Sequence, residues 1–253
     1  MPYLSIIIPT KNEHENLPRL LMSIRSQTFT DHEIIVSDAN SEDDTRRIAA
    51  DYGALVVDGG LPGPGRNRGA AVAHGHVLLF LDADVILSEP DFLEMNLAEM
   101  KDRGICVGTP FVKPLSNNYI DKAMHEIYNA FVISTERVRP HAPGFCIFVK
   151  KHTHQEIGGF DETVVFAEDH DYVQRAKKAG YRFRVIRARP ISVSVRRLEK
   201  DGRLSIAFKY MQAELHMLTK GPYKEMPYEY NMGGDIPEPQ NEPEGEVSDD
   251  AEK

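Results

Sequence analysis

Two aspartates, Asp82 and Asp84, follow the apolar run VLLFL (77–81) with only Ala83 between them. In an extended strand, residues i and i+2 point to the same side, so the two carboxylates would stand close together. A hard divalent cation such as Mg²⁺ or Mn²⁺ prefers oxygen ligands, and it often takes one or two carboxylates while phosphate oxygens and water complete its shell. The alternative is a strand that simply reaches solvent, where an aspartate commonly opens a turn. That alternative explains one aspartate better than two.

Polar stretches also follow the earlier apolar runs. The runs at 4–9, 33–38 and 54–58 lead into residues 9–13, 38–41 and the glycine-rich 59–69, and the polar candidates there are Pro9, Glu13, Asp38 and Arg66. In open α/β sheets, ligands bind outside the carboxyl ends of the strands. The glycine segment does not have the spacing or position of a dinucleotide fingerprint. Its glycines could let the backbone approach a ligand while Arg66 supplies charge near a diphosphate; a flexible loop with solvated arginines is the alternative.

The elements that must position these residues alternate along the chain. Strand-like runs and helix-like segments follow one another, which is typical of an α/β protein with a mostly parallel central sheet flanked by helices. We expect strands at 4–9, 33–38, 54–58, 77–82, 105–112, 145–150 and 181–186, and helices at 16–27, 43–52, from about 66, 91–103, within 118–137 and at 168–179.

The chain reads as one domain with a distinct tail. We expect residues 1–220 to form that domain, with a nucleotide-binding half at 1–84 and an acceptor half at 85–220. From Gly233 onward eight acidic residues face one lysine, a balance of −7 out of a net charge of −9. A segment of this composition has little to bury, so we expect residues 221–253 to form a disordered acidic tail.

Composition excludes several classes of protein. The body lacks the basic excess of a nucleic-acid-binding protein. No apolar run reaches the ~18 residues of a membrane span, and the first residues lack the pattern of a secretory signal. We therefore expect a cytoplasmic protein. Cys106 and Cys146 lie in apolar surroundings, which favours buried free thiols over a disulfide or a metal site.

The ordered set SIIIPTKNE, EIIVSDANSEDDT, GRNRGA, FLDAD, GGFDE and AEDHDYVQRAKKAGYRF resembles the family 2 glycosyltransferases of the GT-A fold. The resemblance covers about residues 4–187. It implies a UDP- or GDP-linked sugar donor, a divalent metal (Mg²⁺ or Mn²⁺), and transfer with inversion to an acceptor hydroxyl or a lipid phosphate. Carried over by position, Pro9, Glu13 and Asp38 would contact the donor's base and ribose, and Arg66 would lie near its diphosphate. Asp82 and Asp84 would form the DxD-type motif that reaches ribose and metal.

The same resemblance supplies a candidate base. Glu168, Asp169 and Asp171 match the family's ED-x-D motif, which implies that Asp169 deprotonates the acceptor and that Glu168 and Asp171 lie on the acceptor side. A positioned carboxylate can contribute roughly 10²- to 10⁴-fold to the rate. The alternative is an acidic helix N-terminus that the helix dipole favours.

The sequence departs from the family at one point. Many relatives place a metal-binding histidine after the following strand, where this chain has Arg196 and Arg197. These arginines could neutralise the donor diphosphate, or they could be a solvated pair. His152 and His154 look like surface residues rather than ligands. A helix predicted at 204–219 carries an apolar stripe that could face the core or make peripheral contact with the inner face of the cell membrane.

Two other functions stay open at this point. A sugar-phosphate nucleotidyltransferase also combines an α/β sheet, a nucleotide and a metal, but it would carry a glycine-rich basic loop directly after the first strand, and TKNEHEN has no glycine. A catalytically silent nucleotide-sugar-binding protein is the other alternative. The intact carboxylates at 82, 84 and 169 weigh against it.

Overall fold

The computed structural model describes residues 1–60, 62–195, 202, 212, 216, 219 and 221–224. Three predictions therefore fall wholly or mostly outside the described residues. They concern the pair Arg196 and Arg197, the helix at 204–219, and the acidic tail from residue 225 onward.

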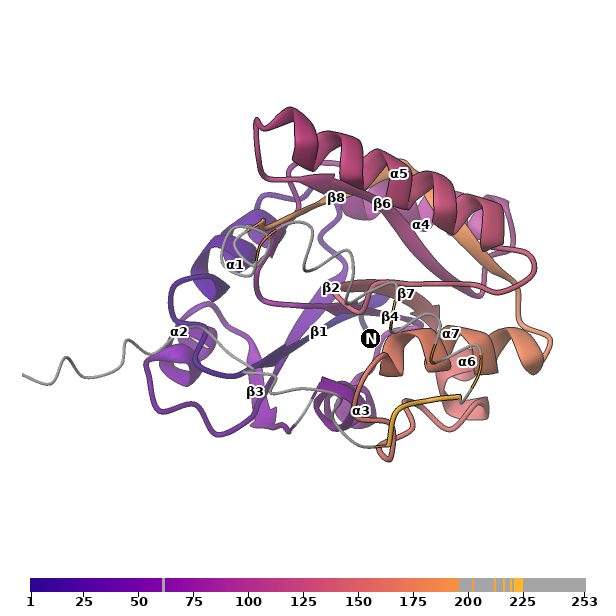
Figure 1. Ribbon diagram of the computed structural model, residues 1–253. Coiled ribbons are helices and arrows are strands. Elements are labelled where there is room, and N and C mark those ends of the chain that lie inside the picture. Colours follow the sequence, from indigo (N-terminus) through magenta and orange to yellow (C-terminus); the bar gives the residue numbers. More distant parts are fainter. Residues whose placement is uncertain are drawn as a thin grey trace, which may run out of the picture.

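Strands and helices alternate through the first half of the chain and continue less regularly beyond it (Figure 1). The strands are β1 (Leu4–Thr10), β2 (His32–Asp38), β3 (Leu55–Asp58), β4 (Val77–Leu81), β5 (Val85–Ile86), β6 (Val107–Pro114), β7 (Cys146–Lys150) and β8 (Phe183–Val193). The helices are α1 (Leu17–Arg25), α2 (Thr45–Asp51), α3 (Pro62–Val72), α4 (Phe92–Asp102), α5 (Tyr119–Thr135), α6 (Lys151–Glu156) and α7 (Glu168–Lys178).

The strands form one sheet in the order β3-β2-β1-β4-β7-β6-β8-β5. Neighbours in the first four strands are parallel, and so are β6 and β8. Strand β7 is antiparallel to both β4 and β6, and β5 is antiparallel to β8. Because β4 and β6 both run opposite to β7, the carboxyl ends of β1, β2, β4 and β6 meet at one edge of the sheet.

Both faces of the sheet are covered, as the apolar runs predict. Alternate residues of β4 belong to two separate core clusters: Leu79 packs with helices α1, α2 and α4, and Phe80 packs with α3 and α7. All five residues of β4 are buried. Figure 1 shows α3, α6 and α7 together below the sheet and α5 above it. Cys146 is buried, Cys106 is half-buried, and both are free thiols, as expected.

Several predicted boundaries need correction. Strand β4 ends at Leu81, so Asp82 and Asp84 lie in the turn that follows, and the same-side argument from an extended strand does not apply to them. Helix α3 begins at Pro62 rather than near Arg66. The last strand continues to Val193, because it pairs with β6 up to that residue and also with β5 at Ser192 and Val193. The short elements β5 and α6 were not predicted.

No helix among the described residues has both the length and the apolar character that crossing a membrane would need.

Candidate functional site

The candidate site is the edge where the parallel strands end. In register, Thr10 of β1 lies beside Asp38 of β2, and Asp38 lies beside Asp58 of β3. The turn with Asp82 and Asp84 follows β4, the next strand in the sheet. The residues that the sequence places after separate strands are therefore brought to one edge.

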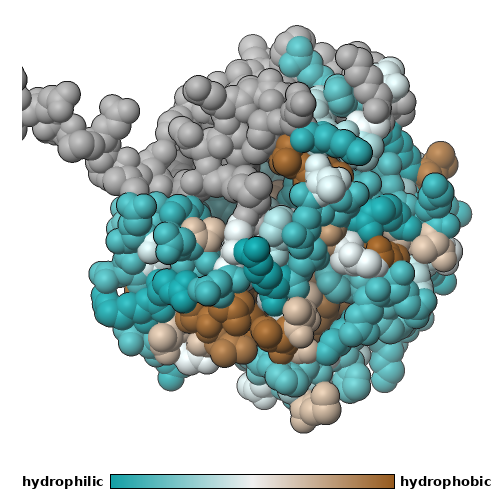
Figure 2. Space-filling model, turned by 90° about the horizontal axis from the view of Figure 1, so that it is seen from below, coloured by the Kyte–Doolittle hydropathy of each residue, from teal (hydrophilic) through white to brown (hydrophobic). Residues whose placement is uncertain are grey.

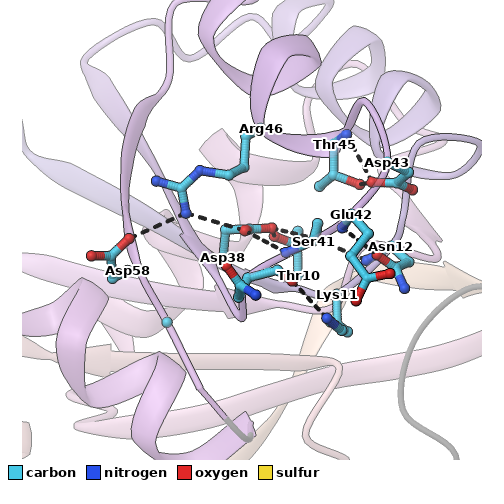
Figure 3. A network of polar contacts seen from close by, with 12 residues as sticks. Thr10, Lys11, Asn12, Asp38, Ser41, Glu42, Asp43, Thr45, Arg46 and Asp58 are labelled. Carbon is cyan, nitrogen blue, oxygen red and sulfur yellow. Dashed lines mark hydrogen bonds and ion pairs between the residues drawn. The ribbon is translucent and has the colours of Figure 1, made fainter.

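Asp38 is the centre of a polar network at this edge (Figure 3). Its Oδ1 accepts hydrogen bonds from the Ser41 amide at 2.9 Å and from Arg46 Nη1 at 3.2 Å. Its Oδ2 accepts from Ser41 Oγ at 2.6 Å and from Thr10 Oγ1 at 3.0 Å. Burial raises the pKa of this carboxyl. The hydrogen bonds from Ser41, Thr10 and Arg46 lower the pKa by more than burial raises it, so the net shift is downward. Asp38 is a fixed anion.

The loop after β1 is tied to the loop after β2. Lys11 Nζ donates to the Asn40 carbonyl at 2.6 Å, and the Glu13 amide donates to Thr45 Oγ1 at 2.8 Å. The carboxylate of Glu13 accepts from Asn16 Nδ2 at 2.8 Å. Pro9 lies against the start of α3, since a Cβ on Gly65 would stand 3.4 Å from Pro9 Cβ. Pro9, Glu13 and Asp38 thus line one polar end of the edge.

Arg66 occupies the other end and is 2% exposed. Its Nη2 donates to Asp82 Oδ1 at 2.9 Å and to the Gly144 carbonyl at 3.1 Å, and its Nη1 donates to Glu168 Oε1 at 2.6 Å. Burial lowers the pKa of this guanidinium, but the charges of Asp82, Glu168 and Asp169 raise it more, so it stays protonated. One arginine therefore joins the turn after β4 to the start of α7.

The carboxylates of Glu168 and Asp169 stand at the N-terminus of α7. Asp169 Oδ2 accepts from the Gly144 amide at 2.6 Å, and 17% of its side chain is exposed. Ala167, directly before the helix, has left-handed backbone angles (φ 59°, ψ 34°), a conformation that costs free energy in a residue with a side chain. Burial and the neighbouring Asp169 raise the pKa of Glu168, and Arg66 opposes them without cancelling the rise. The left-handed backbone of Ala167 and the burial of Glu168 both cost free energy at this end of α7.

Asp171 points elsewhere. Its Oδ2 accepts from Arg175 Nε at 2.6 Å, one turn further along α7, and Arg175 also donates to the carbonyls of Ile157 and Gly159. The structure thus brings Asp82, Glu168 and Asp169 together around Arg66, while Asp171 takes part in a separate packing contact. An acceptor-side role for Asp171 stays a prediction.

Two residues that build this site, Gly144 and Asn67, were not predicted from the sequence. A Cβ on Gly144 would stand 2.8 Å from Arg66 Nη2 and 3.1 Å from Asp169 Oδ2, so a side chain there would displace both. Asn67 donates to the Phe160 carbonyl at 2.9 Å and accepts from the Phe160 amide at 2.8 Å, which fastens GGFDE to α3. The signal for Asn67 was its place beside Arg66. For Gly144 the only signal was Pro143-Gly144 before an apolar strand.

His154 was predicted wrongly as a surface residue. It is 7% exposed, and its Nδ1 lies 2.9 Å from the Tyr172 hydroxyl. Burial and the nearby Arg175 lower its pKa to about 4. His152, two residues earlier on α6, is exposed as expected.

A divalent cation fits the donor atoms at this edge only in part. Asp82 and Asp84 offer the carboxylate oxygens that Mg²⁺ or Mn²⁺ prefers. One oxygen of Asp82 is already bound by Arg66, and 39% of that side chain is exposed. Among the residues that the structure describes, no group of three or more His, Cys, Asp or Glu side chains is placed to hold a metal. A metal here would need ligands from a bound molecule such as a diphosphate.

A mixed sheet with helices on both faces, and with acidic residues after β2 and β4, defines a nucleotide-sugar transferase fold of the GT-A type. Residues 5–158 match the family described as "Glycosyl transferase family 2". The chain belongs to this family, as the sequence motifs predicted.

The chain is also similar to individual proteins. Glycosyltransferase AglE of Haloferax volcanii is 27% identical over 201 residues, which is 72% of this chain and 63% of that protein. The GalNAc(5)-diNAcBac-PP-undecaprenol beta-1,3-glucosyltransferase of Campylobacter jejuni is 38% identical over 93 residues, 33% of this chain and 30% of that protein. The chain thus spans less than two thirds of the length of these relatives.

A solved structure with the same fold is the mannosyltransferase PcManGT of Pyrobaculum calidifontis in complex with GDP-Man and Mn²⁺. The TM-score is 0.68 at 20% identity, and the match covers 84% of this chain and 61% of that one. At this identity the likeness supports the fold alone.

Proposed function

We propose that this protein transfers a sugar, with inversion at the anomeric carbon, from a nucleotide-diphosphate sugar to an acceptor. The observation that carries the proposal is the contact of Arg66 with both Asp82 and Glu168. Through this contact, Asp82 of the predicted donor half and Glu168 of the predicted acceptor half bind the same guanidinium group. A transfer reaction needs the donor and the acceptor at one such place.

In this proposal Asp169 is the general base. It accepts the proton of the acceptor hydroxyl as the oxygen attacks the anomeric carbon, and the bond to the nucleoside diphosphate breaks. The Gly144 amide at 2.6 Å orients the carboxylate for this step. Glu168 and Arg66 fix the start of α7 and so position Asp169.

Asp38, Glu13 and Pro9 would hold the base and ribose of the donor, and Asp82 and Asp84 would reach ribose and metal. Mg²⁺ or Mn²⁺, bound by Asp84 and Asp82 together with the diphosphate, would stabilise the negative charge on the departing nucleoside diphosphate. Mn²⁺ and GDP-Man occur together in the similar mannosyltransferase structure, which favours this set of ligands. Arg66 is buried among carboxylates, so Arg196 and Arg197 are the arginines we propose for the diphosphate itself.

The acceptor is a hydroxyl of a glycan or a lipid-linked molecule, or a lipid phosphate. One relative is named for a lipid-linked acceptor, an undecaprenol diphosphate glycan. A lipid-linked acceptor would place the protein in the cytoplasm at the inner face of the cell membrane. Family membership weighs against a nucleotidyltransferase, and hydrolysis of the donor in the absence of acceptor would exclude a silent binding protein.

The substitution Asp169→Asn tests the proposal. It keeps the shape of the side chain but removes the proton acceptor, so we expect the single-turnover transfer rate to fall by roughly 10²-fold or more while donor affinity changes little. Asp102→Asn, an exposed residue at the end of α4, is the matched control and should leave both values unchanged. Transfer by Asp169→Asn near the wild-type rate would refute the assignment and point to Glu168 or Asp171.

A further inference from the structure

Helix α5 carries an exposed apolar stripe on its outer side. Ile120, Ile127 and Phe131 are 59%, 71% and 41% exposed. They are seven and four positions apart, so they lie on one face of the helix. Tyr119, the first residue of α5, and Val138, three residues beyond the end of α5, are 85% and 81% exposed. Large apolar side chains gathered on one helix face are unusual on a surface that meets only water.

No described element covers this stripe. Helix α5 packs against β6 through its inner side, where Asn129 is bonded to the backbone of Val112 at 2.9 Å in both directions. Figure 1 shows α5 at the outer edge of the molecule, with no other coloured element above it. Seen from below, the described surface is mostly hydrophilic, with a hydrophobic cluster near its lower centre and several smaller hydrophobic spots (Figure 2).

A basic hollow of about 310 Å³ adjoins the end of the stripe. Its lining includes four cationic residues, Arg137, Lys177, Arg182 and Arg184, and Glu136 is the one acid among the lining residues. Glu136 is 5% exposed and is used within the fold, since its carboxylate accepts from the Val185 amide at 2.9 Å.

The hollow keeps a net positive charge, because its four cations outnumber Glu136, which pairs with Arg184 at 4.0 Å. Burial lowers the pKa of Arg184, Glu136 opposes this, and Arg182, Arg137 and Arg103 lower it further. Lys177 donates to the carbonyls of Arg137 and Val138, so the hollow is continuous with the segment that ends the stripe. An apolar stripe that ends in a net positive charge complements a surface with an apolar interior and an anionic outer layer.

We propose that the stripe (Tyr119, Ile120, Ile127, Phe131 and Val138) and the basic hollow form one docking face for a membrane that contains anionic phospholipids. The apolar side chains enter the acyl boundary, and the arginines contact the lipid phosphates. Residues 233–253 account for −7 of the net charge of −9, so residues 1–232 carry only −2, and the basic hollow is a part of this body that an anionic membrane attracts.

This orientation has a consequence that rests on the proposed function. Helix α5 begins just after β6, and the Leu115 amide donates to the Val193 carbonyl at 2.8 Å, while the Ser194 amide donates to the Asp84 carbonyl at 3.4 Å. The segment that leads from β6 into α5 is thus connected through the end of β8 to the turn with the DxD-type motif. A membrane under α5 would meet the edge of the sheet where a lipid-linked acceptor is needed.

Vesicle co-sedimentation of the full chain, without donor or acceptor, tests the docking face. We expect binding to vesicles of equal parts phosphatidylcholine and phosphatidylglycerol, weaker binding at high salt, and little binding to phosphatidylcholine alone. The double substitution Ile127→Glu with Phe131→Glu should lower the partition coefficient by about tenfold or more, and Arg137→Glu with Arg182→Glu should do the same and weaken the salt dependence.

The controls match each change on α1, at exposed positions. They are Met22→Glu, to be compared with the single change Ile127→Glu in the stripe, and Arg19→Glu with Arg25→Glu for the hollow; both should bind like wild type. If the double stripe variant fails to fold by circular dichroism, the single change Ile127→Ser replaces it, because that side chain is 71% exposed.

Three results would overturn the proposal. The first is that the chain does not bind anionic vesicles, and the second is that both double variants still bind them. The third is that vesicle binding is absent while sedimentation velocity shows a concentration-dependent dimer that the stripe variant abolishes. The last result would make the stripe an interface between copies of this chain. Donor affinity measured on the same variants separates the two proposals, because it should not change when vesicle binding is lost.

Discussion

Arg66 is the residue on which the candidate site depends most. A buried guanidinium loses its hydration and regains the free energy only through well-placed partners, which here are Asp82, Glu168 and the Gly144 carbonyl. The arrangement gathers Asp82, Glu168 and Asp169 near a single positive charge. That local excess of negative charge favours a divalent cation at the turn after β4.

Removing the charge of Arg66 should therefore destabilise the protein. We expect Arg66→Met to lower the free energy of unfolding by about 3 kcal/mol, the low end of the range for a broken buried pair, because Asp82 is 39% exposed. Arg66→Lys should recover only part of this loss, since an ammonium cannot bridge two carboxylates as the planar fork does. Urea unfolding measures both. Arg47→Met, which breaks exposed pairs with Asp44 and Asp51, should lower the free energy of unfolding far less than Arg66→Met does. Equal costs for Arg66→Met and Arg47→Met would contradict this account.

His154 gives the stability a pH dependence of its own. Its pKa is lowered from 6.5 to about 4, so between these values the unfolded chain holds more protons than the folded one. The free energy of unfolding therefore falls as the pH falls through this window, by roughly 3 kcal/mol at most from this group, and is unaffected by it above pH 6.5.

The substitution His154→Gln should flatten the slope of stability against pH between about 6.5 and 4. It also removes the contact with Tyr172, so the slope rather than the absolute stability is the quantity to compare. His152→Gln changes an exposed histidine on the same helix and should keep the wild-type slope. A wild-type slope in His154→Gln would show that the buried ring titrates normally.

At the scale of elements, close packing of α3 on β1 depends on a glycine. A Cβ on Gly69 would clash with Ile7 Cγ2, and both residues are buried. We expect Gly69→Ala to lower the free energy of unfolding by about 1–2 kcal/mol, although alanine favours a helix by about 1 kcal/mol. Gly63→Ala in the same helix is the matched control, because its Cβ would meet nothing closer than 3.6 Å, and its stability should equal or exceed wild type. A stabilised Gly69→Ala, measured by urea unfolding, would show that the contact relaxes freely.

Most elements were predicted from the sequence, and only the short elements β5 and α6 among the described residues were not. The apolar runs of β1, β2, β4 and β7 and the periodic helices α1, α4 and α5 are close to their predicted bounds, since burial on one or both faces leaves a clear pattern. Helix α6 has only six residues, KHTHQE. All six are polar, so the sequence gives no indication that His154 is buried. Helix α3 begins within a glycine- and proline-rich stretch that locally favours a loop, and there tertiary packing overrides propensity.

The positions of the candidate site residues at strand ends could be predicted from the sequence, but the contacts between them could not. Residues at strand ends, such as Asp38 and Asp82, follow from topology, because parallel strands end at one edge. The resemblance to family 2 drew attention to Glu168 and Asp169. No local pattern shows that Arg66 and Glu168, 102 positions apart, would share a hydrogen bond, or that the backbone of Gly144 would bond both Arg66 and Asp169. Such contacts are set by the whole fold.

At the scale of the molecule, donor binding should join the two halves of the edge and raise the stability of the whole domain. A ligand at 100 times its dissociation constant adds about 2.7 kcal/mol to the free energy of unfolding. For a domain of this size, that corresponds to a rise in Tm of roughly 5–10 °C. Differential scanning fluorimetry with GDP, UDP and their sugars, each with Mn²⁺, should therefore show which nucleotide the network around Asp38 selects.

The metal dependence of that shift tests the turn after β4. If Asp82 and Asp84 hold the cation through the donor diphosphate, EDTA should abolish most of the shift, and Asp84→Asn should do so even in excess Mn²⁺. Asp102→Asn, which removes one negative charge from the exposed end of α4, should keep the full shift. A nucleotide shift that persists in EDTA and in Asp84→Asn would mean that the diphosphate is bound by protein groups alone. Arg196 and Arg197 would then be the next residues to replace, because Arg66 is already committed to Asp82 and Glu168.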